Sequence, residues 1–236
     1  MPLTRRRLLA AGSALAAAPL LPAFANEPSL APAPGAAPPL PPPFPRDVYR
    51  ERQGRALAAA KAAGLDALVA APSTNMAYLC GSDPGRSERL MALVLRPDAT
   101  SAFVTPAFEE ERVRREVVVE RTVVWTEEED PAKLLATLLK GAKRIGIEGT
   151  TDFHTVSRLG DATNARIVDA AAVFDGLRAV KTEAEKALLR DAASRMQAAI
   201  AATHAKLAAG MTEREAGEIV GAELRRLGRA SSRRPG

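Results

Sequence analysis

Short apolar runs alternate along the chain with longer segments in which apolar and charged residues recur at helical spacing. The run Asp66–Ala71 is almost wholly apolar and stops at Pro72, which is typical of a buried strand. Segment 131–140 instead follows an N-cap acid, Asp130, and opens with proline, which predicts a helix. The same criteria predict strands at 66–71, 90–95, 102–105, 121–125, 144–148 and 165–168, and helices at 47–64, 108–116, 131–140 and 153–159. We therefore expect an α/β domain over residues 46–178, with a mixed sheet of five or six strands flanked by helices.

The pattern changes after Asp175, where two long amphipathic segments follow one another. Each opens with a capping box, Thr182 with Glu185 and Thr212 with Glu215, which predicts helices at 182–208 and 212–227 separated by Gly210. Their apolar stripes contain Leu188, Met196, Ile200, Leu207, Ile219, Val220, Leu224 and Leu227. Because no strand pattern follows to cover these stripes, we expect residues 179–228 to be the first helices of an incomplete domain, followed by a disordered basic tail at 229–236.

The first 45 residues have the composition of an export signal and a spacer. Arg5 and Arg6 form a twin-arginine pattern ahead of an apolar stretch, and Ala23-Phe24-Ala25 supplies the small residues of a cleavage site. We expect residues 1–25 to be a signal peptide cleaved after Ala25, and the protein to be periplasmic or secreted, with no membrane attachment afterwards. An uncleaved anchor or a misassigned start codon is the alternative. Residues 26–45 contain nine prolines, which favours an extended linker over a recognition ligand.

The formal charge of +5 belongs to the two ends of the chain. Five arginines stand in the last twelve residues and three in the predicted signal, so residues 26–224 carry a net charge of −3. A folded basic face is therefore not indicated, and we expect no nucleic-acid partner. Cys80 is the only cysteine, which excludes an intrachain disulfide and a cysteine-based metal site.

Four passages in order resemble the pita-bread metallopeptidases, the group of Xaa-Pro aminopeptidases, prolidases and creatinase. Gly64–Val69 is similar to the first helix-to-strand junction of that family, and Pro72–Gly81 to its Asn-x-x-Tyr-Leu-x-Gly segment. Arg178–Glu185 resembles the Arg-x-x-Lys-(Thr/Ser)-x-x-Glu linker that opens the catalytic domain, and Gly210–Glu213 the Gly-x-Thr-Glu turn after its first long helix. The resemblance implies a creatinase/prolidase N-terminal-type domain followed by two helices of an incomplete pita-bread domain.

The resemblance also implies a chemistry for which this chain lacks the residues. The family uses two divalent metals, Mn or Zn, held by two Asp about eleven residues apart, one His and two Glu. No such Asp pair follows residue 181, the acids after it lie on helices, and His204 is the only histidine in that part of the sequence. We therefore expect no catalytic residue, metal ligand or cofactor in this chain. Metals and a peptide substrate are expected only in a full-length form, and a homodimer by resemblance.

Three functions remain open at this point. The chain is an Xaa-Pro-type metallopeptidase fragment that is inactive alone, a non-enzymatic periplasmic dimerisation or ligand-binding module derived from that family, or a nonfunctional gene fragment. Substrate-loop candidates are Asn75, Tyr78, Arg86 and Arg89, which surround the polar loop 81–85; solvated loop arginines are the plainer interpretation.

The remaining residues with possible chemistry favour structural interpretations. His154 is expected at the surface or as a helix cap, since one histidine without a clustered partner binds metal weakly. His204 is expected to pack or be partly exposed in mid-helix, and Cys80 to be buried. The acidic run 127–130 precedes a helix N-terminus, where it interacts favourably with the dipole; a cation site there is the alternative.

Overall fold

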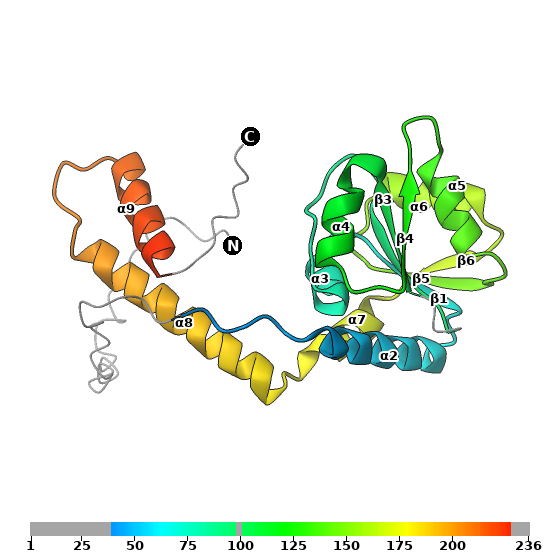
Figure 1. Ribbon diagram of the computed structural model, residues 1–236, viewed down its shortest axis with the longest axis horizontal. Helices are drawn as coiled ribbons and strands as arrows, with labels where there is room; N and C mark the ends of the chain where they lie inside the picture. The colour runs from blue at the N-terminus through cyan, green and yellow to red at the C-terminus, as the bar shows by residue number, and fades with distance from the viewer. Residues whose placement is uncertain (1–38, 98–100, 228–236) are drawn as a thin grey trace, which may run out of the picture. The chain divides into compact units, whose positions relative to one another are not determined.

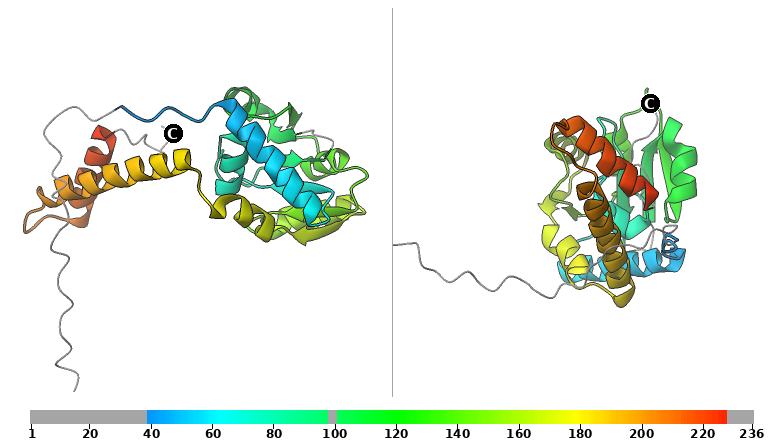
Figure 2. Two further views of the ribbon diagram at one scale, coloured as in Figure 1. Left: turned by 90° about the horizontal axis from the view of Figure 1, so that it is seen from below. Right: turned by 90° about the vertical axis from the view of Figure 1, so that its left-hand side faces the viewer.

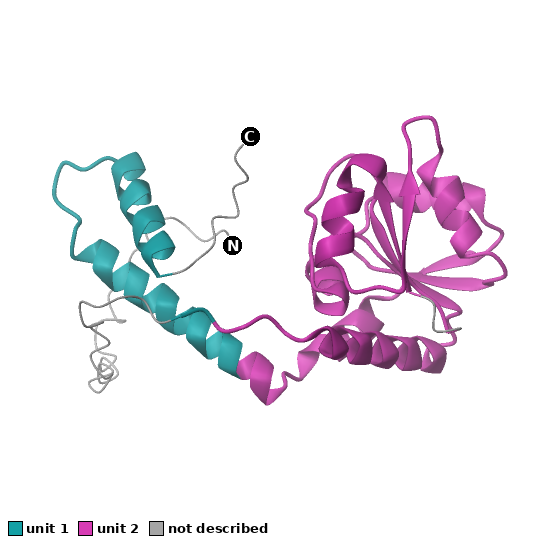
Figure 3. Cartoon of the chain, in the orientation of Figure 1, with its two compact units in different colours: residues 1–40, 187–236 teal, residues 41–186 magenta. Residues whose placement is uncertain are grey.

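The computed structural model describes residues 39–97 and 101–227, which fall into two compact units. One unit is the α/β unit, residues 41–186, and the other contains the described residues 39–40 and 187–227. The boundary lies inside helix α8 (Glu183–His204), as the colouring of Figure 3 shows. None of the helices in the described ranges is long and apolar enough to cross a membrane. The predicted signal peptide with Arg5, Arg6 and Ala25, and the tail 229–236, lie outside the described residues.

The α/β unit is built on a six-stranded mixed sheet with the order β4-β3-β2-β1-β5-β6 (Figure 1). β2 is antiparallel to both β1 and β3, whereas β1, β5 and β6 are mutually parallel and β3 is parallel to β4. Five strands therefore run in one direction, and their carboxyl ends share one edge of the sheet. The strands are β1 (Ala67–Ala70), β2 (Ala92–Leu95), β3 (Ser101–Pro106), β4 (Arg121–Trp125), β5 (Arg144–Ile147) and β6 (Arg166–Asp169).

Alternate residues of the strands face two separate hydrophobic cores, because successive side chains of a strand point to opposite faces. On β1, Leu68 and Ala70 belong to one core and Ala67 and Val69 to the other. The first core lies under α2 (Arg46–Ala62), α3 (Thr74–Cys80), α4 (Glu110–Glu116) and α7 (Ala171–Ala179). The second lies under α5 (Pro131–Leu138) and α6 (Phe153–Ala162). The predicted α/β fold with a mixed sheet of five or six strands is confirmed, and the sheet has six.

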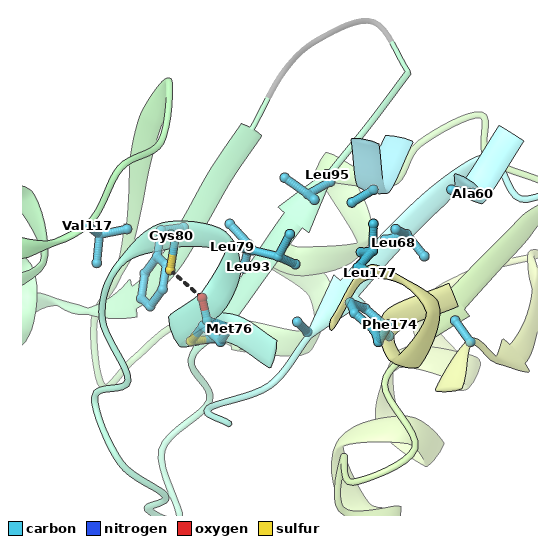
Figure 4. Close-up of a cluster of buried hydrophobic side chains, with 14 of the residues drawn as sticks. Ala60, Leu68, Met76, Leu79, Cys80, Leu93, Leu95, Val117, Phe174 and Leu177 are labelled. Carbon is cyan, nitrogen blue, oxygen red and sulfur yellow. Dashed lines mark hydrogen bonds between the residues drawn. The ribbon is translucent and has the colours of Figure 1, made fainter. Parts of the chain in front are cut away.

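The first core gathers side chains from segments that are far apart in the sequence (Figure 4). Leu68 and Leu93 from the sheet lie among Met76 of α3 and Phe174 of α7. The view from below in Figure 2 shows α2 across this face of the sheet with α7 beside it. Gly146 of β5 is required here, because a Cβ at this position would lie 2.6 Å from Leu65 Cδ1 and 2.9 Å from Ala170 Cβ.

Two short helices were not among the sequence predictions. α3 begins after Ser73, whose hydroxyl accepts a hydrogen bond from Met76 N, and ends at Gly81 with φ +91°. Its seven residues are too few to show helical periodicity, although Ser73 and Gly81 are cap residues of the usual kind. Asn75 and Tyr78 therefore lie in this helix, and the polar loop 81–85 follows it. α7 is the other unpredicted helix; it fills the segment between β6 and the linker.

The second unit contains most of α8 and all of α9 (Glu213–Arg226). The predicted capping box of Thr212 and Glu215 is present. α8 ends at His204 instead of the predicted position 208, because Lys206 N and Leu207 N bond carbonyls only three residues back. His204 is therefore an exposed residue at a helix end and not a mid-helix residue.

Candidate functional site

The carboxyl edge of the sheet carries a polar cleft, the edge cleft, made of two adjoining hollows of about 370 and 420 Å³. This edge is where ligands bind in many open α/β sheets. Segments that follow β1, β4 and β5 and that precede β2 meet here. The side chains common to both hollows are Glu88, Arg89, Leu90, His154 and Thr155.

Two of the four substrate-loop candidates, Arg86 and Arg89, line the edge cleft. Arg89 pairs with Glu127 and lies 3.7 Å from Glu88, with its guanidinium 5.1 Å from the centre of the Phe108 ring. Arg86 is exposed and donates to the Thr150 carbonyl at 3.2 Å. Because Arg89 is engaged by two carboxylates, Arg86 is the more available of the two for an anionic group.

Two acids beside the edge cleft, Asp130 and Asp152, are helix caps. Asp130 accepts from Ala132 N at 2.9 Å and from Arg158 at 2.6 Å. Partial burial acts to raise the pKa of Asp130, but these hydrogen bonds outweigh it and hold the pKa below its usual value. Asp152 caps α6 through Thr155 N at 2.8 Å. His154 is exposed in the first turn of α6, as predicted.

Asn75 and Tyr78, the other two candidates, do not line the edge cleft. Asn75 donates to Glu148 Oε1 at 2.7 Å and accepts from Arg178 at 2.7 Å. Glu148 is buried and also accepts from the Ser73 hydroxyl at 2.8 Å. Asn75 is thus held by a charged group on each side, which fixes its amide and leaves it little freedom to bind a ligand.

Tyr78 lies at the centre of a second set of contacts. Its hydroxyl donates to the Leu177 carbonyl at 3.1 Å and accepts from Arg55 at 2.9 Å. Its ring lies 4.1 Å from the guanidinium of Arg52, which pairs with Glu185 at 2.7 Å. Arg52 and Glu148 were not among the predicted site residues, since nothing local distinguishes an arginine or glutamate whose partner is distant in the chain.

The described residues do not fit a divalent metal pair. No group of three or more His, Cys, Asp or Glu side chains in 39–97 and 101–227 is placed to hold an ion. The acids of α8 and α9 have other partners: Asp191 pairs with Arg195, Glu218 with Arg214, and Glu223 with Lys206 and Arg226. Glu223 is buried.

Cys80 is buried in the first core, as predicted, and its thiol donates to the Met76 carbonyl at 3.1 Å. Burial raises the pKa of Cys80 to about 12. A thiol in this state is a poor nucleophile, because the reactive form is the thiolate.

Residues 52–180 match the family model of the creatinase/prolidase N-terminal domain. The chain belongs to the creatinase/prolidase family. Within it, a relative from Mycobacterium tuberculosis described as probable dipeptidase PepE is 34% identical over 168 residues, which cover 70% of this chain and 44% of the relative. A relative from Mycobacterium bovis with the same description has the same values.

Solved structures of the family share the fold. The crystal structure of dipeptidase PepE from Mycobacterium ulcerans is 31% identical, with a TM-score of 0.66, over 77% of this chain and 51% of that one. A recombinant prolidase from Thermococcus sibiricus gives a TM-score of 0.68 at 23% identity, over 75% and 49% of the two chains, and shows the fold alone. The chain thus spans about half the length of these creatinase/prolidase family members.

Proposed function

We propose that this chain contributes the N-terminal domain, and the first helices of the catalytic domain, to an exported Xaa-Pro-type metallopeptidase. The observation that carries the proposal is the match to the mycobacterial dipeptidase relatives. It runs over 168 residues, longer than the domain at 52–180, so it extends into segments beside that domain.

The contacts of the described residues support a structural role for this chain, in which segments are held in position, over a catalytic role. Asn75 and Tyr78 lie in one segment that resembles the family. They bond to Arg178, the first residue of another such segment, and to the carbonyl of Leu177 just before it. These two segments therefore hold each other in place. Two divalent metals, Mn or Zn, and a peptide substrate would be bound by a longer form that carries the ligands, and homodimerisation belongs to the same proposal.

A chimera tests whether the chain can play this part. Residues 26–227 are joined to the remainder of Mycobacterium tuberculosis PepE from the point where the two sequences cease to align. We expect Mn²⁺-dependent hydrolysis of an Xaa-Pro dipeptide by the chimera and none by this chain alone. The same PepE remainder without an N-terminal domain is the control. A folded chimera that binds Mn²⁺ but does not hydrolyse the peptide, beside active intact PepE, would refute the proposal.

Export is tested separately in a host with a twin-arginine pathway. N-terminal sequencing of the exported protein should show a start at Asn26, and replacing both Arg5 and Arg6 by lysine should abolish export. A mature protein that begins at Met1, or export that survives the double replacement, would contradict this part of the proposal.

A further inference from the structure

The linker between α7 and α8, residues 180–182, has little contact with the rest of the α/β unit. Val180 leaves α7 in an extended conformation with 83% of its side chain exposed, and Lys181 and Thr182 are exposed as well. Thr182 and Glu185 form a capping box that starts α8, but a cap acts within the helix and does not attach it to anything else. The first turn of α8 is nevertheless part of the α/β unit, which extends to residue 186.

Arg52 makes the attachment from α2. Its side chain is 8% exposed and surrounded by three rings, with centres 4.7, 5.3 and 4.1 Å away in Phe44, Tyr49 and Tyr78. The planar guanidinium uses its two terminal nitrogens for different partners, the Tyr78 carbonyl at 3.0 Å and Glu185 Oε1 at 2.7 Å. Only an arginine combines stacking on rings with two hydrogen bonds in fixed directions. Phe44 lies inside the predicted linker 26–45, so the end of that segment takes part in the packing.

The two carboxylate oxygens of Glu185 also have different partners. Oε2 accepts from Thr182 N at 2.8 Å and closes the cap, whereas Oε1 binds Arg52. The capping interaction and the attachment to α2 therefore pass through a single carboxylate, which is 15% exposed.

We infer that Arg52 and Glu185 form a clamp that fastens the first turn of α8 to the α/β unit, so that the unit ends inside the helix and not at the exposed linker. Arg52 is then a positioning residue: it holds the first turn of α8 against α2. The Arg178–Asn75 hydrogen bond secures the other side of the linker at α7. A buried ion pair contributes little net stability after desolvation, but leaving one of its charges unpaired is costly, so it is suited to fixing a position. This inference does not depend on the proposed peptidase function.

The clamp predicts an unusual order of hydrogen exchange along one helix. Helix ends normally fray first, so the amides of residues 186–190 should exchange faster than those of 191–204 if α8 were held only by its cap. With the clamp, we expect amides 186–190 in the monomeric fraction of the full chain to exchange at least tenfold more slowly than amides 191–204.

Glu185→Gln separates the clamp from the cap, because glutamine still caps at this position but cannot form the ion pair with Arg52. We expect exchange at 186–190 to rise at least tenfold in Glu185→Gln and in Arg52→Gln, with amides of β2 and β5 unchanged. Glu183→Gln is the matched control, since Glu183 pairs with the partly exposed Lys186 in the same turn. It should leave exchange at 186–190 within about twofold of the unmodified chain, the small effect typical of an exposed pair.

Arg52→Lys keeps the charge but cannot reach both partners, and should give an intermediate rate. If Arg52→Gln also speeds hydrogen exchange at the β-strand amides, that variant has disturbed the fold of the α/β unit. Glu185→Gln then tests the clamp, because it leaves the rings around Arg52 intact. Equal exchange at 186–190 in Glu185→Gln and Glu183→Gln would overturn the clamp.

Discussion

The two units differ in how they use their apolar residues. In the α/β unit, large side chains such as Phe103, Phe174 and Leu135 are at most 1% exposed. In residues 187–227, Leu189 is 56% exposed and Ile200 59%, and the buried apolar residues there are Ala199 and Leu227. The helical signals are nonetheless as clear in the second unit as in the first. Local signals thus specify a helix, whereas its stability comes mainly from packing of an apolar face.

Polar contacts connect the two helical segments of the second unit. Glu223 is buried between Lys206 and Arg226, whose hydrogen bonds hold its pKa below the usual value despite desolvation. Arg195 donates to the Leu227 carbonyl at 2.7 Å and pairs with Asp191. These contacts orient the two helices, but they do not replace the transfer of apolar area from water.

The largest expected difference between the units is therefore in hydrogen exchange. Amides of the strands within 66–170 should exchange through global unfolding, with free energies of about 5–15 kcal/mol, whereas residues 191–227 should exchange through local opening at a small fraction of that. Exchange followed by mass spectrometry on a demonstrated monomer measures both. Equal protection in the two units would mean that α8 and α9 belong to a complete fold.

The next largest effect concerns large apolar side chains, one from each unit. Phe103→Ala should lower the free energy of unfolding of the α/β unit by about 3–5 kcal/mol, because it leaves a cavity in the first core. Ile200→Ala should change the free energy of unfolding of the α/β unit by less than about 0.5 kcal/mol, since Ile200 lies in the other unit and is 59% exposed. Urea unfolding followed by the fluorescence of Trp125, the only tryptophan, reports on the α/β unit. Similar losses in both variants would remove the contrast.

The same contrast explains which parts of the structure could be predicted from the sequence. All six strands and the long helices follow from periodicity and caps, which are local. α3 has too few residues for a period, and the end of α8 depends on a change of hydrogen-bonding pattern after His204. The placement of Asn75 and Tyr78 could not be predicted, because Glu148, Leu177 and Arg178, to which they bond, lie 73 to 103 residues away. The Arg52–Glu185 contact spans 133 residues and has no local signature.

Replacing glycine by alanine should lower stability at one position in the α/β unit and raise it at one position in the other unit. Gly146→Ala would bring a Cβ within 2.6–3.0 Å of Leu65, Ala170 and Leu68, and should cost the α/β unit about 1–3 kcal/mol through overpacking. Gly217 of α9 has no neighbouring atom within 4 Å of such a Cβ, so Gly217→Ala should stabilise that helix by up to about 1 kcal/mol. Thermal melts followed by circular dichroism and by Trp125 fluorescence separate the two effects. A neutral Gly146→Ala would show that the core around Leu65 yields easily.

The smallest expected effect is on the pH dependence of unfolding. It compares one carboxylate from each unit. Asp66 precedes β1 and accepts from Lys143 N at 2.8 Å and Arg144 N at 2.9 Å, and these two backbone hydrogen bonds lower its pKa. A folded-state pKa that lies below the unfolded-state pKa of about 3.9 adds stability at pH values above 3.9. That stability is lost as the pH falls through the folded-state pKa. Asp66→Asn should therefore destabilise the α/β unit at pH 7, by less than about 1 kcal/mol because Asp66 is exposed.

The difference between Asp66→Asn and the unmodified chain should then shrink as the pH is lowered below 4. Glu215 provides the matched control, since hydrogen bonds from Thr212 N and from the Thr212 hydroxyl lower its pKa in the same way, but in the other unit. Glu215→Gln should leave the unfolding reported by Trp125 unchanged at every pH. An Asp66→Asn effect that stays constant down to pH 2, or a Glu215→Gln effect on Trp125, would contradict the assignment of these carboxylates to units that unfold separately.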